Sequence, residues 1–195
     1  MKFIALSTVL SSLLSLSLAT TNTVDTSLCT IDTDAAPTYI GVNKDVLVQS
    51  ASCPPTVAQT PAVAEFRAGT LQARQTNVCG AQCATNCFAG TANGPTAGDC
   101  SVIASAILYE SQSVGPLFTV GPAPGAPSQP NTLVMSFRNC QTFYLNQSNA
   151  SQTYCRTAWS DLVNWLNTEC SATKGRHGGN CVATNQAWFV QVQKP

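Results

Sequence analysis

The stretch Tyr154–Val192 reads YCRTAWSDLVNWLNTEC, then SATKGRHGGNC, then VATNQAWFVQV, and the predicted fold is built outward from it. It predicts a helix between Cys155 and Cys170, a basic glycine-rich loop that ends at Cys181, and a closing strand. A helix and a strand joined through cysteines indicate a small α+β domain held by disulfides.

The predicted helix has one apolar side. At 100° per residue, five residues fall in a stripe no wider than about 120°, as an amphipathic helix packed on a core requires. They are Trp159, Leu162, Val163, Leu166 and Cys170. Thr157 or Ser160 is the expected N-cap. Trp165 lies about a quarter turn off the stripe, so we expect part of its ring to reach the surface.

The residues after this helix predict a reversal and then a half-buried strand. Gly175, Gly178 and Gly179 permit the positive φ angles of a tight turn. The side chains of the closing strand then alternate between two faces, Trp188, Val190 and Val192 on one and Phe189, Gln191 and Gln193 on the other. We expect the first face in the core and the second to be at least half polar.

The N-terminus has the pattern of a secretory signal peptide at residues 1–19. Lys2 precedes a short apolar run, and the small residues Ser17 and Ala19 mark the expected cleavage point. No later segment approaches the roughly 20 apolar residues of a membrane-spanning helix. We therefore expect a mature protein that is secreted to the extracellular space and has no membrane span.

Ten cysteines support export, because an even number in an oxidising compartment predicts a disulfide framework. They are Cys29, Cys53, Cys79, Cys83, Cys87, Cys100, Cys140, Cys155, Cys170 and Cys181. Cys29 and Cys53 are expected to pair, and the connectivity of the other eight stays open. Three of the ten are spaced by four residues, but oxidised thiols do not bind zinc, so we expect no metal and no cofactor.

Charge is scarce: charged residues make up 9% of the chain, and the formal net charge is zero. Nucleic-acid binding needs a basic face that neutralises phosphates, and electrostatic attachment to anionic membranes needs one too. The composition argues against both partners.

Composition also divides the chain after the signal peptide. Residues 20–74 are rich in Thr and Pro, contain a strand candidate at 45–49, and end at Arg74, which resembles a processing site. They are predicted to be either a propeptide or an N-terminal segment. Residues 75–195 are predicted to form the disulfide-stapled α+β domain, beginning with a loop-rich strap at 75–98.

The order of elements in this domain predicts its sheet. A helix capped by Asp99 covers 100–112, and prolines exclude regular structure from 121–130. Further strands are predicted at 117–120, 132–137 and 141–145. With the second helix and the last strand, we expect a small antiparallel sheet of about four strands and two main helices. Sequons at Asn146 and Asn149 mark an exposed loop that is expected to carry glycans.

The domain has few groups for catalysis. It has one histidine, His177, and the strongest enzyme hypothesis joins it to Glu110 as base and Arg156 as phosphate clamp, in a small secreted hydrolase such as a ribonuclease. Nothing in the spacing of these residues supports that site. We therefore expect a protein without catalytic residues.

Ligand binding is the stronger expectation. Glycan recognition uses an aromatic ring that stacks on the sugar and polar groups that orient it. The rings least committed to a core stripe are Trp165, Tyr144 and Phe189. The expected polar partners are Arg176, His177 and Asn180, with Lys174 and Asn185 nearby.

Several motifs resemble one family of fungal proteins. CFAGTANGPTAGDC at 87–100, FRNCQTFYLNQ at 137–147, and a Cys-bounded helix that leads to a glycine pair at 155–179 are similar to the Y3-like family of fungal glycan-binding proteins. The resemblance covers about 87–192 and implies a small αβα-type sandwich and lectin function. No binding residue carries over from it, and residues 20–74 depart from the family pattern.

The same order of elements is also similar to KP4-like killer toxins and Ecp2-type fungal effectors. The first hypothesis is therefore a secreted fungal lectin-like protein whose partner is a carbohydrate or a host-surface glycoprotein. The alternative is a secreted toxin or effector, and the third is the small hydrolase. The oligomeric state does not follow from the sequence.

Overall fold

The computed structural model describes residues 29–33, 36–54, 76–90, 94–125 and 128–195. The expected signal peptide at 1–19 lies outside these residues. The described part has two α-helices and two sheets, so the predicted α+β class is confirmed. None of its helices is long and apolar enough to cross a bilayer.

The two α-helices are α1 at Ala97–Ser113 and α2 at Arg156–Glu169, and a short 3-10 helix follows at Ala172–Lys174. The strands before α1 are β1 Thr30–Ile31, β2 Thr38–Ile40, β3 Val46–Ser52, β4 Thr76–Asn77 and β5 Cys83–Ala89. Those after it are β6 Leu117–Val120, β7 Thr132–Phe137, β8 Cys140–Asn146, β9 Gln152–Cys155, β10 Arg176–Ala183 and β11 Trp188–Gln193.

The larger sheet has eight strands, so the prediction of about four is wrong. Its order is β1-β3-β7-β8-β11-β10-β5, with β2 also paired to β3, and every pair is antiparallel. Three of the eight strands come from the N-terminal segment. They join the sheet through β3, which pairs directly with β7. Two more come from residues predicted as loops: β5 from the strap, and the start of β10 from the glycine-rich stretch. Removal of residues 20–74 stays a prediction, and residues 55–75 lie outside the described part.

A smaller sheet of three strands stands beside the larger one, in the order β4-β9-β6. Here β4 runs parallel to β9, whereas β6 pairs with β9 in the antiparallel sense. Because β9 leads directly into α2, this sheet sets the start of that helix.

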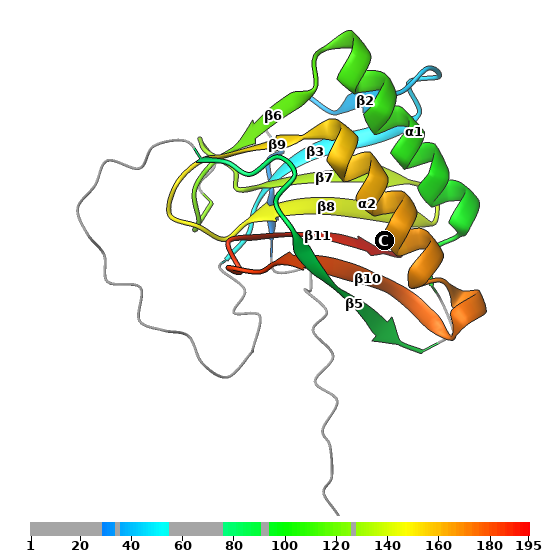
Figure 1. Ribbon diagram of the computed structural model, residues 1–195. Helices are drawn as coiled ribbons and strands as arrows, with labels where there is room; N and C mark the ends of the chain where they lie inside the picture. Colours follow the sequence, from blue (N-terminus) through cyan, green and yellow to red (C-terminus); the bar gives the residue numbers. More distant parts are fainter. Residues whose placement is uncertain (1–28, 34–35, 55–75, 91–93, 126–127) are drawn as a thin grey trace, which may run out of the picture.

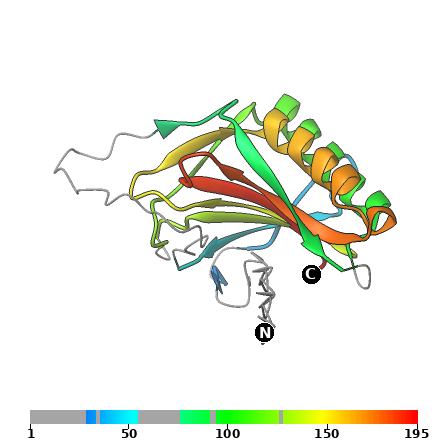
Figure 2. The same ribbon diagram turned by 60° about the horizontal axis from the view of Figure 1, so that its bottom comes forward.

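Both α-helices pack against each other and against the same face of the larger sheet (Figures 1 and 2). The described residues therefore place a helix layer on one face of the sheet, and the αβα layering that the resemblance implies is not seen in them. The contacts of α1 are with β2, β3, β7 and β8, and those of α2 are with β5, β9, β10 and β11. Each helix thus covers one half of the sheet.

The apolar stripe predicted for α2 is confirmed. Trp159, Val163, Leu166 and Cys170 are buried, and Leu162 is half-buried. The predicted N-caps are wrong. The cap of α2 is Cys155, and the Ser160 hydroxyl instead donates to the carbonyl oxygen of Ala104 at 2.8 Å, joining the two helices.

The predicted cap of α1 is also wrong. Thr96 precedes the helix as its N-cap, and Asp99 lies within the first turn. Its carboxylate accepts a hydrogen bond from the backbone amide of Asn139 at 3.2 Å, which attaches the helix to the β7–β8 turn. The side chain thus caps a neighbouring turn rather than its own helix.

All ten cysteines form disulfides. The pairs are Cys29–Cys53, Cys79–Cys155, Cys83–Cys181, Cys87–Cys170 and Cys100–Cys140. The expected pairing of Cys29 with Cys53 is confirmed. The three closely spaced cysteines of the strap each bind a different distant element, so their sulfur atoms are not metal ligands.

Candidate functional site: the Trp165 seam

Tyr144, the second predicted ligand ring, lies in the core. It is fully buried and stacks between Tyr154 and Trp188, with ring centroids 4.8 and 5.8 Å away. Its hydroxyl donates to Oε1 of Gln152 at 2.8 Å. Burial raises the pKa of Tyr144 far above its usual range, and the nearby Tyr154 raises it further. The ring packs on the helix side of the sheet and has no exposed surface for a ligand.

Phe189 is buried as well. It lies on the face of the larger sheet turned away from Trp188, where it packs edge-on against Phe143 with ring centroids 5.8 Å apart. Leu145 and Val134 belong to the same apolar cluster. The prediction that Phe189 is one of the rings least committed to the core is therefore wrong, because both faces of the central strands are buried.

The basic residues of the glycine-rich stretch do not converge on one site. Lys174 pairs with Glu169 at 3.0 Å, and Arg176 is exposed at the start of β10. The half-buried ring of His177 packs against Gly90 and lies 6.3 Å from the ring of Phe88. These side chains belong to separate local contacts.

The polar residues further along β10 are also engaged. Asn180 is buried, and its Oδ1 accepts a hydrogen bond from Asn86 of β5 at 3.2 Å. Asn185 is exposed in the turn after β10, where its side chain accepts from the amide of Ala187 at 3.1 Å. The side chain of Asn180 therefore stabilises the pairing of β10 with β5, and that of Asn185 stabilises the turn after β10.

Of the three hydrolase residues, Arg156 and Glu110 lie near each other, but His177 does not join them. Arg156 opens α2, where its guanidinium donates to the carbonyl oxygens of Gly115 and Leu117. Burial lowers its pKa, and the nearby Glu110 carboxylate opposes that shift. His177 follows the other end of this helix, which has 14 residues and spans roughly 20 Å. The three side chains do not form one site.

Trp165 is the predicted ligand ring that reaches the surface. It is 52% exposed, whereas Trp159 and Trp188 are buried. Its indole Nε1–H donates to the Thr85 hydroxyl at 3.1 Å. The ring therefore lies along the line where α2 meets β5, and we call Trp165, Thr85 and Asp161 the Trp165 seam.

The seam is held on both sides by disulfides. Cys87–Cys170 joins β5 to the end of α2, and Cys83–Cys181 joins β5 to β10. Asp161 is exposed one helical turn before Trp165, and thus on the same side of α2. The seam presents an exposed apolar ring, with a carboxylate one helical turn away on the same side of α2, and groups of these two kinds can contact the apolar face and the hydroxyl groups of a sugar.

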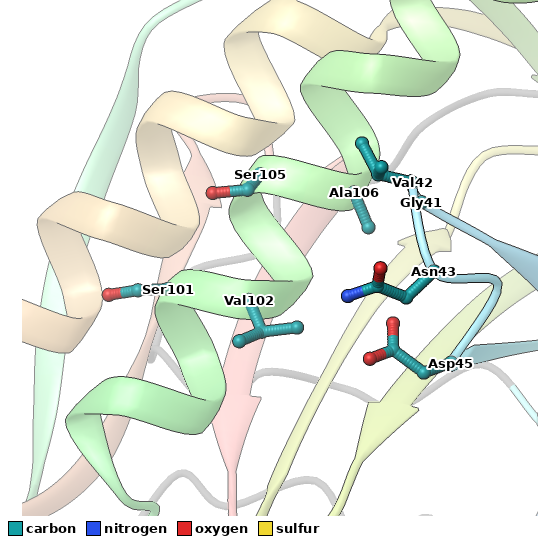
Figure 3. Close-up of a pocket in the computed structure, with 8 residues that line it drawn as sticks. All are labelled: Gly41, Val42, Asn43, Asp45, Ser101, Val102, Ser105 and Ala106. Carbon is teal, nitrogen blue, oxygen red and sulfur yellow. The ribbon is translucent and has the colours of Figure 1, made fainter.

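Sequence reasoning missed Thr85, because residues 75–98 were predicted as a loop. It also missed a hollow with a volume of 310 Å³ between the β2–β3 turn and α1. Figure 3 shows the side chains of Asn43 and Asp45 pointing from this turn toward Val102 on the helix. In the sequence, only the strand candidate at 45–49 indicates that a turn lies nearby.

Comparison with protein-family models and with curated proteins finds no match to this chain. Its resemblance to Y3-like glycan-binding proteins and to KP4-like or Ecp2-type proteins therefore stays a prediction.

Proposed function

We propose that this protein is a secreted, non-catalytic glycan-binding protein of lectin type, and that Trp165 is its stacking ring. The observation that carries the proposal is a half-exposed indole whose N–H is already bound to Thr85. An aromatic ring kept in water and held in one orientation is suited to stacking on a ligand.

The seam is preorganised for such contact. The hydrogen bond to Thr85 and the Cys87–Cys170 disulfide place the ring before a ligand arrives. Fixing a side chain in advance removes an ordering cost of about 0.5–1.5 kcal/mol from binding. Asp161 supplies acceptors for sugar hydroxyl groups, so the seam combines the two features that glycan sites share.

A glycan array on protein secreted from a recombinant host tests this function. We expect micromolar or tighter binding to a defined oligosaccharide, lost in Trp165→Ala and partly retained in Trp165→Phe. Tyr39→Ala is the matched control, because its ring is 49% exposed but lies on β2. Near-UV circular dichroism verifies that each variant is folded.

Acrylamide quenching of tryptophan fluorescence reports on the same site, because Trp165 is exposed and the other two tryptophans are buried. A bound oligosaccharide should protect the emission from quenching. EDTA should leave binding unchanged, since the seam uses no metal. A silent array, together with growth inhibition or cell death caused by the protein, would favour a toxin or effector instead.

A further inference from the structure

The hollow between the β2–β3 turn and α1 is a concave surface on the other half of the helix layer from the Trp165 seam. Its volume of 310 Å³ lies at the lower end of the roughly 300–1,000 Å³ found for ligand pockets. The turn is part of a chain segment that pairs with β7, and α1 contacts both β2 and β3. The two walls are therefore fixed to the same sheet.

The turn approaches the helix closely and in an unusual backbone conformation. Gly41 has φ +90°, and a Cβ there would lie 3.0 Å from Cβ of Ala106. Lys44 has φ 50°, and its amide donates to the carbonyl oxygen of Gly41 at 3.1 Å. A non-glycine residue at positive φ is costly, and such residues cluster at binding sites.

The turn side of the hollow carries an amide and a carboxylate, and the helix side is mixed (Figure 3). Asn43 and Asp45 point from the turn across the hollow, and the helix side is lined by Val102, by the exposed residues Ser101 and Ser105, and by Ala106, which is only 4% exposed. Neither Asn43 nor Asp45 has a hydrogen bond or ion pair with another described residue. An amide and a carboxylate thus face Val102 across a space of monosaccharide size, with two serine hydroxyl groups on the same helix.

This arrangement fits a sugar ring. The C–H face of a hexose would pack on Val102, while Asp45 would accept from its hydroxyl groups and Asn43 and the two serines would both donate and accept. A carboxylate also attracts an amine and repels an acid. The chemistry therefore selects neutral or amine-bearing hexoses over acidic sugars.

We propose that the hollow is a second saccharide-binding site and that one chain is bivalent for glycans. The hollow lies beside α1, whereas the Trp165 seam lies beside α2, so the two sites occupy different halves of the helix layer (Figure 1). The bivalent reading rests on the proposed function, but the hollow is a site in its own right. Bivalence lets a single chain join two glycans.

Titration of ¹⁵N-labelled protein, followed by amide chemical shifts, tests the two sites separately. The probes are methyl α-mannopyranoside, methyl β-galactopyranoside, triacetylchitotriose and N-acetylneuraminic acid. At least one of the first three should shift the amides of 41–46 and 101–106 saturably, and the acid should not. Asp45→Asn should weaken this response by a factor of about 10 or more, since it removes a charge-assisted hydrogen bond.

Lys44→Asn is the matched control, because it changes the neighbouring charge and asparagine tolerates positive φ. It should leave the response unchanged. Asp45 is exposed, so Asp45→Asn is expected to fold, and near-UV circular dichroism checks this. The agglutination titre of cells or glycan-coated beads should fall roughly 100-fold in Asp45→Asn, since avidity needs both sites.

The outcomes separate the two proposals. Shifts confined to 82–87 and 161–169 would overturn the second site and leave the proposed function standing. Shifts confined to the hollow would support the second site and overturn Trp165 as the stacking ring. No shift with any probe, or a hollow that responds to N-acetylneuraminic acid, would overturn the inference drawn here from Asp45.

Discussion

The two sequons, Asn146 and Asn149, are three residues apart but differ completely in structure, and this difference predicts which one carries a glycan. Asn146 is fully buried at the end of β8, whereas Asn149 is exposed in the following turn. A glycan on Asn146 would require its side chain to leave the core. We expect secreted, folded protein to be glycosylated at Asn149 and not at Asn146.

The magnitude follows from the hydrogen bonds of Asn146. Its Nδ2 donates to the carbonyl oxygens of Gly121 and Ala150, each at 2.7 Å. Its Oδ1 accepts from the amide and the hydroxyl of Ser148, at 2.9 and 2.8 Å. At a net value of about 1 kcal/mol each, the four bonds contribute about 4 kcal/mol. That is a large part of the 5–15 kcal/mol typical of a folded domain.

Two alanine variants measure this contribution. Asn146→Ala should lower the free energy of unfolding by about 4 kcal/mol, which shifts the urea midpoint by about 2 M for a slope near 2 kcal/mol/M. Asn149→Ala should change it by less than about 0.5 kcal/mol. Both variants are compared after enzymatic removal of glycans, so that the sugar itself does not affect the stability.

Peptide mass spectrometry locates the glycan, because enzymatic release converts the modified asparagine to aspartate. The expected conversion is at Asn149. Equal midpoints for the two variants, or a glycan on Asn146 in protein that shows native near-UV circular dichroism, would refute the reasoning from burial and hydrogen bonding.

Three further predictions concern stability and the disulfides. The free energy of unfolding should fall above about pH 10, because burial raises the pKa of Tyr144 and Tyr154 above the value in the unfolded chain. Below about pH 10 both tyrosines contribute their full stabilisation. By about pH 11 the free energy of unfolding should have fallen by roughly 1.4 kcal/mol per tyrosine. In a Tyr39→Phe, Tyr109→Phe background, phenolate absorbance should then rise only together with unfolding. Ser160→Ala should cost about 1 kcal/mol by removing the hydrogen bond from α2 to the Ala104 carbonyl oxygen of α1, whereas Ser101→Ala, at an exposed helix position, should change the urea midpoint little. Ellman reagent on denatured, unreduced protein should find no free thiol, and peptide mapping should recover the five pairs of the structure; a Cys79–Cys83 link, for example, would contradict them.

The sequence predicts the direction of side chains better than it predicts what covers them. The period of α2 correctly places Trp159 in the core and Trp165 partly at the surface. Alternation along a strand at 141–145 also places Tyr144 on the opposite face to Phe143, and the two rings belong to different clusters in the structure. Both faces of β8 are buried, however, so the Tyr144 side chain, which points away from Phe143, lies in a second apolar cluster. Burial on both faces is a tertiary property that the alternation of one strand does not contain.

The N-terminal segment shows a second limit. Its Thr- and Pro-rich composition predicts a part separate from the domain, and therefore does not indicate Asn43 or Asp45 as ligand residues. In the structure β3 pairs along its length with β7, so residues 46–52 lie inside the larger sheet. Strand pairing between segments distant in sequence depends on register across the whole sheet, and local composition does not report it.

The strand missed in the strap explains how the Trp165 seam is built. The sequence of β5, CATNCFA, has no apolar alternation, and of its seven residues only Phe88 is buried. Burial contributes little to holding such an edge strand against β10. The antiparallel pairing with β10 and the disulfides Cys83–Cys181 and Cys87–Cys170 hold it instead, and each disulfide typically stabilises a fold by about 2–4 kcal/mol.

Because β5 is held by covalent bonds, its remaining side chains are free to be polar and exposed. Thr85 can then lie at the surface and accept the hydrogen bond from the indole of Trp165. An apolar, buried strand would have no hydroxyl group at this position. Reduction of these two disulfides should therefore free the Trp165 side chain from Thr85 before α2, whose buried side contains Trp159, unfolds. The arrangement of sulfur bridges thus links the unusual sequence of the strap to the exposed ring on which the proposed glycan binding depends.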